Sequence, residues 1–206
     1  MEKNDNKKIK LLMLTQRIDI DDDLLGFMHG WTAKLAGYCE KITVIALGAG
    51  KYDLPENVKL FSLGKKLANS KWPIANRARY TVNFYKYIWR YRNEYDYVFV
   101  HMNKEYMVLG GLLWRLWGKK TALWYNHRYG NMWGKLAGAL ANIIFFTSPF
   151  SFFSKNKKAK QMPAGIDTEK FQVSSSKFHI IFRKDLAGQK TRCFAKGGKD
   201  TGRSRD

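Results

Sequence analysis

Histidine, asparagine and arginine side chains follow two apolar segments of the chain, at the points where those segments end. His101 and Asn103 follow the first segment, and Asn126, His127 and Arg128 follow the second. An imidazole with a pKa near neutrality can bond a sugar hydroxyl or carry a proton. A guanidinium can hold a phosphate. These residues predict a site for a polar or anionic ligand, with His127 as the candidate catalytic group. A buried packing histidine is the alternative for His101, and both interpretations stay open for His127.

Gly26 lies in a loop, 16–26, that joins a buried segment to a predicted helix. A glycine at a helix start lets a phosphate approach the backbone amides, assisted by the helix dipole. An ordinary turn glycine is the alternative. The sequence contains neither G-x-G-x-x-G nor G-x-x-x-x-G-K-[ST], which excludes the dinucleotide-binding and P-loop classes on motif grounds.

These loops are positioned by strands and helices that alternate along the chain. Such alternation predicts βαβ units, and hence an α/β, three-layer, Rossmann-like domain with a mainly parallel sheet. Ligands bind such sheets at the carboxyl ends of the strands. We therefore expect loops 16–26, 101–105, 126–131 and 147–150 to share one edge. The expected strands are 9–15, 42–47, 58–63, 97–101, 120–125, 143–146 and 159–162; the expected helices are 25–38, 80–93, 104–117 and 132–141, with a basic loop at 65–79, a helical turn at 149–154 and a disordered N-terminus at 1–8.

The composition favours a packed domain with an anionic partner. Hydrophobic residues make up 45% of the 206 residues, and the formal net charge is +20. Such a surplus suits a nucleotide, a phospholipid surface or a nucleic acid. No nucleic-acid recognition motif accompanies the charge, so specific nucleic-acid binding is not expected. The aromatic and basic stretch 65–92 has three interpretations: a surface for anionic lipid, a nucleic-acid-binding surface or a solvated helix face.

Metal and redox chemistry find no support in the spacing of possible ligands. Cys39 and Cys193 are far apart in sequence, and no Cys/His cluster has metal-ligand spacing. We expect no metal and no cofactor. The polar start of the chain lacks an apolar signal-peptide core. The expected location is the cytoplasm, with peripheral contact at the inner face of the membrane as an option.

The order of motifs resembles that of the family 4 (group 1) glycosyltransferases of the GT-B fold, over about residues 8–173. The motifs are an acidic loop ending in Leu25-Gly26, the segment 95–101, Gly118-Lys119-Lys120 before a strand, Thr147-Ser148, and Pro163-Ala164-Gly165-Ile166-Asp167-Thr168-Glu169-Lys170-Phe171. The last of these is the most specific.

The resemblance implies the amino-terminal, acceptor-side domain (9–165) of a retaining enzyme in cell-envelope or glycan biosynthesis. Such an enzyme transfers sugar from a nucleotide-sugar co-substrate to a glycan or lipid-linked acceptor. It implies a donor-diphosphate role for Gly26, where the family more often has a Gly-Gly pair, and a transferred-sugar contact for His127. His101, Asn103, Asn126 and Arg128 would face the acceptor or sugar.

The family pattern also implies a second domain and a linker that starts at 166–173. The segment 174–206 instead has nine basic and three acidic residues, which contribute +6 of the net charge, and no apolar period. Codons permitted for 182–193, read with a shift of one nucleotide, can encode the Gly-Arg strand expected at this point. We expect a frameshifted, non-native and disordered tail, and negligible turnover by this chain alone. The alternative function is a non-catalytic basic module that binds an anionic glycan or a membrane surface.

Overall fold

A computed structural model describes residues 9–65 and 73–165. The predictions for 1–8, for the linker 166–173 and for the tail 174–206 lie outside the described residues, as does part of the predicted basic loop.

The described strands form one seven-stranded sheet in the order β3-β2-β1-β4-β5-β6-β7, and every neighbouring pair is parallel. The order of the strands reverses between β1 and β4, so the topological switch point lies there. The predicted α/β class with a parallel sheet is therefore confirmed. The strands are β1 (Ile9–Ile18), β2 (Cys39–Ala49), β3 (Val58–Ser62), β4 (Tyr97–His101), β5 (Lys120–Trp124), β6 (Ile143–Phe146) and β7 (Ala159–Gln161).

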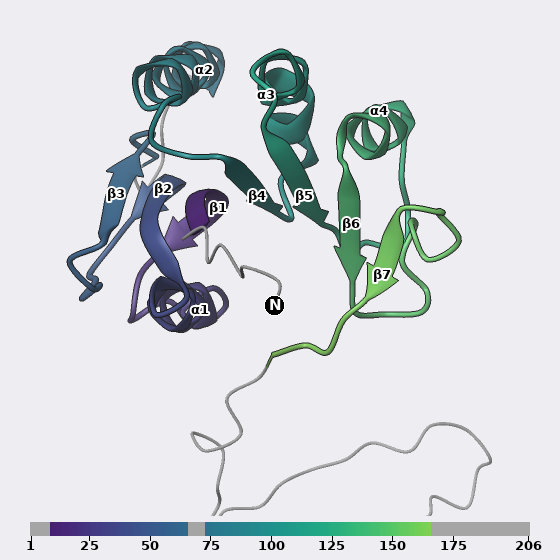
Figure 1. The fold of residues 1–206 in the computed structure, drawn as a ribbon, viewed down its shortest axis with the longest axis horizontal. Coiled ribbons are helices and arrows are strands. Elements are labelled where there is room, and N and C mark those ends of the chain that lie inside the picture. Colours follow the sequence, from purple (N-terminus) through teal and green to yellow (C-terminus); the bar gives the residue numbers. More distant parts are fainter. Residues whose placement is uncertain (1–8, 66–72, 166–206) are drawn as a thin grey trace, which may run out of the picture. The chain divides into compact units, whose positions relative to one another are not determined.

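Helices cover both faces of the sheet, which makes the three predicted layers. The helix α1 (Phe27–Ala36) lies on one face, and α2 (Pro73–Arg90), α3 (Lys104–Leu116) and α4 (Met132–Leu140) lie on the other (Figure 1). The central parts of β1 and β2 are continuous apolar runs, because the sheet is covered by helices on both of its faces. Alternate residues of β1 show this directly: Met13 packs toward α1, whereas Leu12 and Leu14 pack in the core beneath the other helices.

Several element boundaries differ from the expectation. The strand β1 continues to Ile18 rather than residue 15, and β2 covers Cys39–Ala49 rather than 42–47. The helix α2 begins at Pro73, although the sequence predicted a loop as far as residue 79. Proline is well suited to the first helical turn, where its missing N–H has no intrahelical partner. The predicted helix at 25–38 is shorter at both ends, because Gly26 and Gly37 flank it. The predicted helical turn at 149–154 is a pair of turns, with hydrogen bonds from Ser151 N to Ser148 O and from Ser154 N to Ser151 O.

None of the helices within 9–65 and 73–165 is long and apolar enough to cross a membrane. In the same ranges no group of three or more His, Cys, Asp or Glu side chains is placed to hold a metal ion.

Candidate functional site

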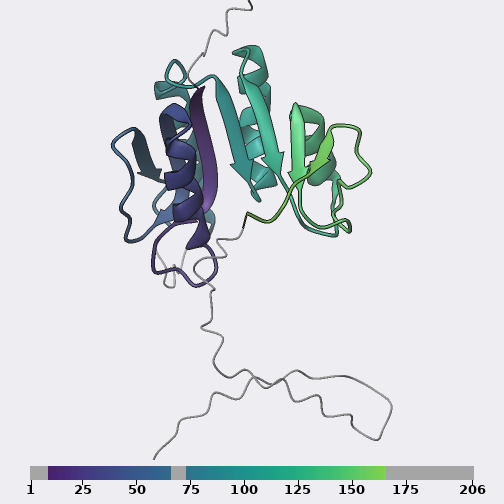
Figure 2. The same ribbon diagram turned by 60° about the horizontal axis from the view of Figure 1, so that its bottom comes forward.

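The four loops singled out from the sequence follow β1, β4, β5 and β6, which are neighbours in the sheet. Because all of these strands are parallel, their carboxyl ends meet at a single edge (Figure 2). The reversal of strand order between β1 and β4 lies at this edge, where open α/β sheets bind ligands. We call this edge the carboxyl rim. The prediction that the loops share one edge is confirmed.

His101 ends β4 and lies under a group of aromatic rings. Its side chain is 4% exposed. The ring centroid of His101 is 5.7 Å from that of Phe27 and 5.8 Å from that of Trp31, both from α1. Trp124, at the end of β5, lies 6.4 Å from the imidazole and 5.1 Å from Trp31. Helix and strand ends thus build an aromatic cage around the histidine.

Burial holds the imidazole of His101 in its neutral form. Desolvation lowers the pKa of His101 to about 4, because burial removes the water that would stabilise the charged imidazolium. Its Nδ1 atom is buried and has no hydrogen-bond partner. A neutral, unpartnered ring nitrogen can exchange a hydrogen bond with a hydroxyl but cannot act as a fixed positive charge at neutral pH.

The turn that follows His101 carries two further irregular features. Met102 has a left-handed backbone with φ of 59°. Asn103 occupies the N-cap position of α3 but makes no side-chain cap bond, and its Nδ2 atom is buried without a partner. An asparagine at a helix start normally caps it, and buried polar groups normally find a partner. Strain and unpartnered polar atoms in one turn are typical of a binding site.

Asn126 instead joins two loops of the rim. Its Oδ1 accepts hydrogen bonds from the backbone amides of Thr147 and Ser148, at 2.9 and 3.0 Å. The carbonyl oxygen of Asn126 therefore has a structural role that the sequence did not indicate. Any direct ligand contact by this side chain would have to use its Nδ2.

His127 and Arg128 lie on the exposed part of the rim. The ring of His127 is 5.1 Å from the ring of Tyr125. The backbone oxygen of His127 accepts a hydrogen bond from Phe152 N. The guanidinium carbon of Arg128 lies 5.8 Å from the ring centroids of both Tyr129 and Phe150. Both side chains are exposed.

Gly26 has a structural explanation that involves no phosphate. Its N–H donates to Asp22 O at 2.9 Å, so this amide is already bonded. A Cβ at position 26 would lie 2.6 Å from the same oxygen. The loop before it is also acidic: the carboxylate of Asp22 accepts from the amides of Leu24 and Leu25. A donor diphosphate at α1 would therefore have to use other amides and meet this acidic loop.

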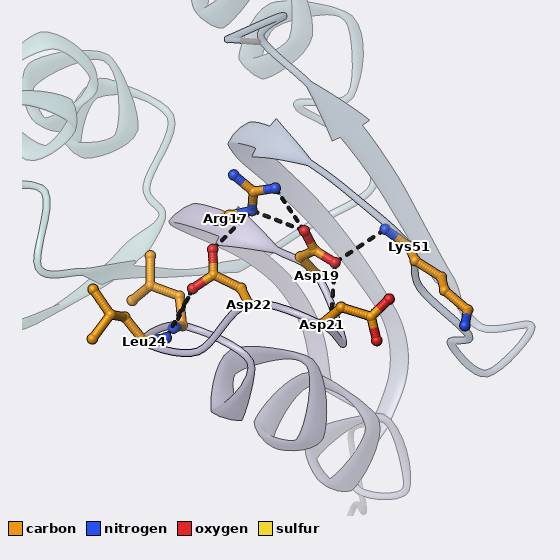
Figure 3. A network of polar contacts seen from close by, with 7 residues as sticks. Arg17, Asp19, Asp21, Asp22, Leu24 and Lys51 are labelled. Carbon is orange, nitrogen blue, oxygen red and sulfur yellow. Dashed lines mark hydrogen bonds and ion pairs between the residues drawn. The ribbon is translucent and has the colours of Figure 1, made fainter. Parts of the chain in front are cut away.

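Arg17 holds the acidic loop together at the end of β1. It contacts Asp19 at 2.6 Å and Asp22 at 2.9 Å, and Asp19 also accepts from the amide of Lys51 (Figure 3). The hydrogen bond from Arg17 lowers the pKa of Asp19. The cation of Arg17 is thus neutralised within the chain.

The aromatic cage was not predicted from the sequence. Part of it was predictable, because Phe27 and Trp31 are four residues apart and therefore share one face of a helix. Nothing in the sequence showed that Trp124 and His101, on neighbouring strands, would meet that face.

Together these observations define a Rossmann-like α/β domain whose carboxyl rim carries polar and aromatic side chains at the topological switch point. No protein-family model matches the sequence, and no curated protein matches it either. Among solved structures, the crystal structure of MurG from Acinetobacter baumannii is similar, with 13% sequence identity and a TM-score of 0.43. The match covers 74% of this chain and 44% of that chain, so this protein spans less than half the length of MurG.

Proposed function

We propose that residues 9–165 form the acceptor-side domain of a nucleotide-sugar-dependent glycosyltransferase of the GT-B type. The observation that carries the proposal is the turn 101–103 at the switch point. It combines the unpartnered Nδ1 of His101, the left-handed Met102 and the non-capping Asn103 beside an aromatic cage. The motif resemblance to family 4 enzymes, from Leu25-Gly26 to Pro163-Ala164-Gly165-Ile166-Asp167, supports the same function.

The chemistry of this turn suits a sugar. A hydroxyl both donates and accepts, so it can satisfy the neutral imidazole of His101 and the amide of Asn103 at once. Aromatic rings such as Trp31 and Trp124 offer apolar faces for the C–H side of a sugar ring. Phe27 is 45% exposed and its ring centroid lies 5.7 Å from that of His101, so we place the approach of a ligand to the cage on the side of Phe27.

His127 is the candidate for contact with the transferred sugar, and Arg128 for contact with a phosphate or the acceptor. Both stand on the loop after β5, one strand away from His101. Catalysis of glycosyl transfer requires a positioned acceptor hydroxyl and stabilisation of charge on the departing diphosphate. On this proposal the described domain positions the acceptor hydroxyl, whereas the resemblance assigns most contacts with the nucleotide-sugar donor to a second domain. We therefore expect negligible transfer by this chain alone.

The family 4 assignment and the frameshift also remain proposals. Reading the gene from codon 165 onward tests both. A shifted frame that encodes a second Rossmann-like domain would support them, and an early stop in that frame would reject the frameshift.

Binding of simple sugars tests the acceptor role directly. The probes are methyl glycosides of glucose, N-acetylglucosamine and mannose, together with UDP-glucose and GDP-mannose. We expect a glycoside to shift the indole N–H resonances of Trp31 and Trp124 in the NMR spectrum of the full chain. The variant Asn103→Ala should abolish the shift without unfolding the protein, because removal of an unpartnered buried amide carries no loss of a hydrogen bond.

Asn93→Ala is the matched control, since Asn93 is an exposed asparagine that precedes β4 at the opposite edge of the sheet. This variant should bind like the wild type. The proposal fails if no glycoside binds, or if the Asn103 and Asn93 variants bind equally well.

A non-catalytic basic module is the second candidate function. It is favoured by the segment 106–165, which contains nine lysines and arginines and no aspartate or glutamate. Such a module would bind an anionic surface and show no response to sugars in the same experiment.

A further inference from the structure

A small pocket opens at the edge of the sheet opposite the carboxyl rim, between the ends of α3 and α4. It lies where β5 begins at Lys120 and where Asn142 leads into β6. Its volume is about 130 Å³, well below the ~300–1,000 Å³ of pockets that enclose drug-sized ligands. This size suits one small group of atoms. We call it the amino-edge pocket, and its cationic and polar lining residues are Arg115, Lys119, Lys120, Thr121 and Asn142.

The last carbonyls of α4 already have donors from within the domain. A helix leaves its last four carbonyls without partners of its own. Here Ala139 O accepts from Lys158 Nζ at 3.0 Å and from Arg115 Nη2 at 3.1 Å. Leu140 O accepts from the hydroxyl of Thr121 at 3.4 Å. These carbonyls therefore do not require a cationic ligand.

The side chain of Asn142 is oriented so that its Nδ2 remains a donor. Its Oδ1 accepts from the backbone amide of Thr121 at 2.8 Å and from the Thr121 hydroxyl at 3.1 Å. A backbone amide can only donate, so this contact fixes which end of the Asn142 side chain is the oxygen. Within the described residues, the hydrogen bonds of this side chain all use Oδ1. The pocket therefore has an amide donor with a fixed direction.

Arg115 and Lys120 supply positive charge to the pocket. A guanidinium has five N–H donors, and among the described residues that of Arg115 makes one hydrogen bond, to a carbonyl of α4. Lys120 is exposed, and its ammonium forms no ion pair with the described part of the chain. Lys119 differs, because its ammonium donates to Tyr95 O and lies 3.7 Å from the carboxylate of Asp96. Two of the three cations thus lack a counter-ion in residues 9–65 and 73–165.

We propose that the amino-edge pocket binds a phosphate group, as inorganic phosphate or as a phosphate monoester. The guanidinium of Arg115 can hold two phosphate oxygens at once, and Lys120 and Asn142 Nδ2 can donate to the others. A phosphate dianion accepts through its oxygens, whereas a sugar hydroxyl would add another donor to a pocket that already has a surplus of them. The proposal is independent of the proposed function, because the pocket and the turn 101–103 lie at opposite edges of the sheet.

Titration of the full chain with inorganic phosphate, followed by NMR, tests the proposal. Chloride holds the ionic strength constant, so that screening does not change during the titration. We expect saturable shifts of the Asn142 side-chain amide and of the Arg115 Nε–H resonance. Methyl phosphate is the second probe. Equal affinity for the two probes assigns the site to the phosphate group alone, and tighter binding of one of them identifies the form that the pocket prefers.

Asn142→Asp should abolish phosphate binding, because a carboxylate keeps both bonds from Thr121 but removes the Nδ2 donor and adds a negative charge. Arg115→Gln should weaken binding about tenfold, since it removes the bidentate contact. Arg77→Gln is the matched control, because Arg77 is an exposed arginine of α2 outside the pocket and the variant removes the same unit charge. It should bind phosphate like the wild type. Thermal unfolding checks that all three variants are folded.

Three results would overturn the proposal. The first is an Asn142 side-chain amide that does not shift with phosphate. The second is an equal loss of binding in Arg115→Gln and Arg77→Gln, which would attribute the binding to net charge. The third is a shift confined to the indoles of Trp31 and Trp124, which would place the anion at the carboxyl rim. The sugar-binding test uses neutral methyl glycosides, so its failure would leave the phosphate result unchanged.

Discussion

Trp31 of α1 donates a hydrogen bond from its indole Nε1 to the carbonyl oxygen of Gly165, at 3.0 Å and 134 residues away in the chain. The contact ties the last described residue to the helix that forms one wall of the aromatic cage. Gly165 has φ of +65°, a conformation that favours glycine. The end of the domain is therefore fixed beside His101, which lies 5.8 Å from Trp31.

We predict that Gly165→Ala lowers the free energy of unfolding by about 1–2 kcal/mol, because the left-handed conformation is strained for alanine. Trp31→Phe should cost about 0.5–1.5 kcal/mol for the lost hydrogen bond. Urea unfolding measures both. A Gly165→Ala variant as stable as the wild type would show that the contact does not hold the chain in place.

The buried imidazole of His101 gives the domain a specific pH dependence. The pKa of His101 falls from 6.5 to about 4 on burial, so the unfolded chain binds more protons between these values. Stability should therefore decrease as the pH falls from 6.5 to about 4, by at most about 1.4 kcal/mol per pH unit. His101→Phe should remove this slope, because phenylalanine fills the cage without a titrating group.

His127→Phe is the control for that slope, since His127 is exposed. It should retain the wild-type pH dependence when unfolding is measured across the same range. Equal slopes in the His101 and His127 variants would show that the imidazole of His101 is not the source.

Alanine substitutions of two glycines, Gly26 at the N-cap of α1 and Gly30 within α1, should change the stability of the protein in opposite directions. Gly26→Ala places a Cβ 2.6 Å from Asp22 O, so we expect a loss of about 1–3 kcal/mol from crowding. Gly30 has nothing within 4 Å of its Cβ position, so Gly30→Ala should stabilise the helix by about 0.5–1 kcal/mol. Thermal unfolding of the two variants measures the difference. A neutral Gly26→Ala variant would remove the structural explanation and favour the donor-diphosphate role of Gly26.

The Arg17 network should contribute to acid stability. Its hydrogen bond to Asp19 lowers the pKa of that carboxyl below 3.8, so the stabilisation is present above this pH and is lost as the pH falls through the folded value. We predict that Asp19→Asn is less stable at neutral pH and loses less stability on acidification. Unfolding curves at neutral and acidic pH test this, and parallel curves for variant and wild type would contradict it.

Much of the fold follows from local patterns, and the exceptions have identifiable causes. Continuous apolar runs predicted the strands because a parallel sheet is buried on both faces, and β4 and β6 match their predicted bounds. The start of α2 was misplaced because 65–79 has no apolar period. The sequence predicted that Asn103 lies at the carboxyl rim, but not how its side chain is used. An asparagine before a helix normally caps that helix, and only the tertiary structure shows that Asn103 makes no side-chain cap bond to α3. The engagement of Asn126 with the loop after β6 depends in the same way on strand order.

The most direct test of the central claim is to map where a sugar binds. Diazirine-tagged glycosides of glucose, N-acetylglucosamine and mannose would be photolysed with the full chain, and the labelled peptides identified by mass spectrometry with untagged glycoside as competitor. We expect labelling of loops 101–105 and 126–131 at the carboxyl rim, and we expect the untagged glycoside to reduce it. Labelling concentrated at the opposite edge, around 117–120, or labelling that untagged sugar does not reduce, would contradict it.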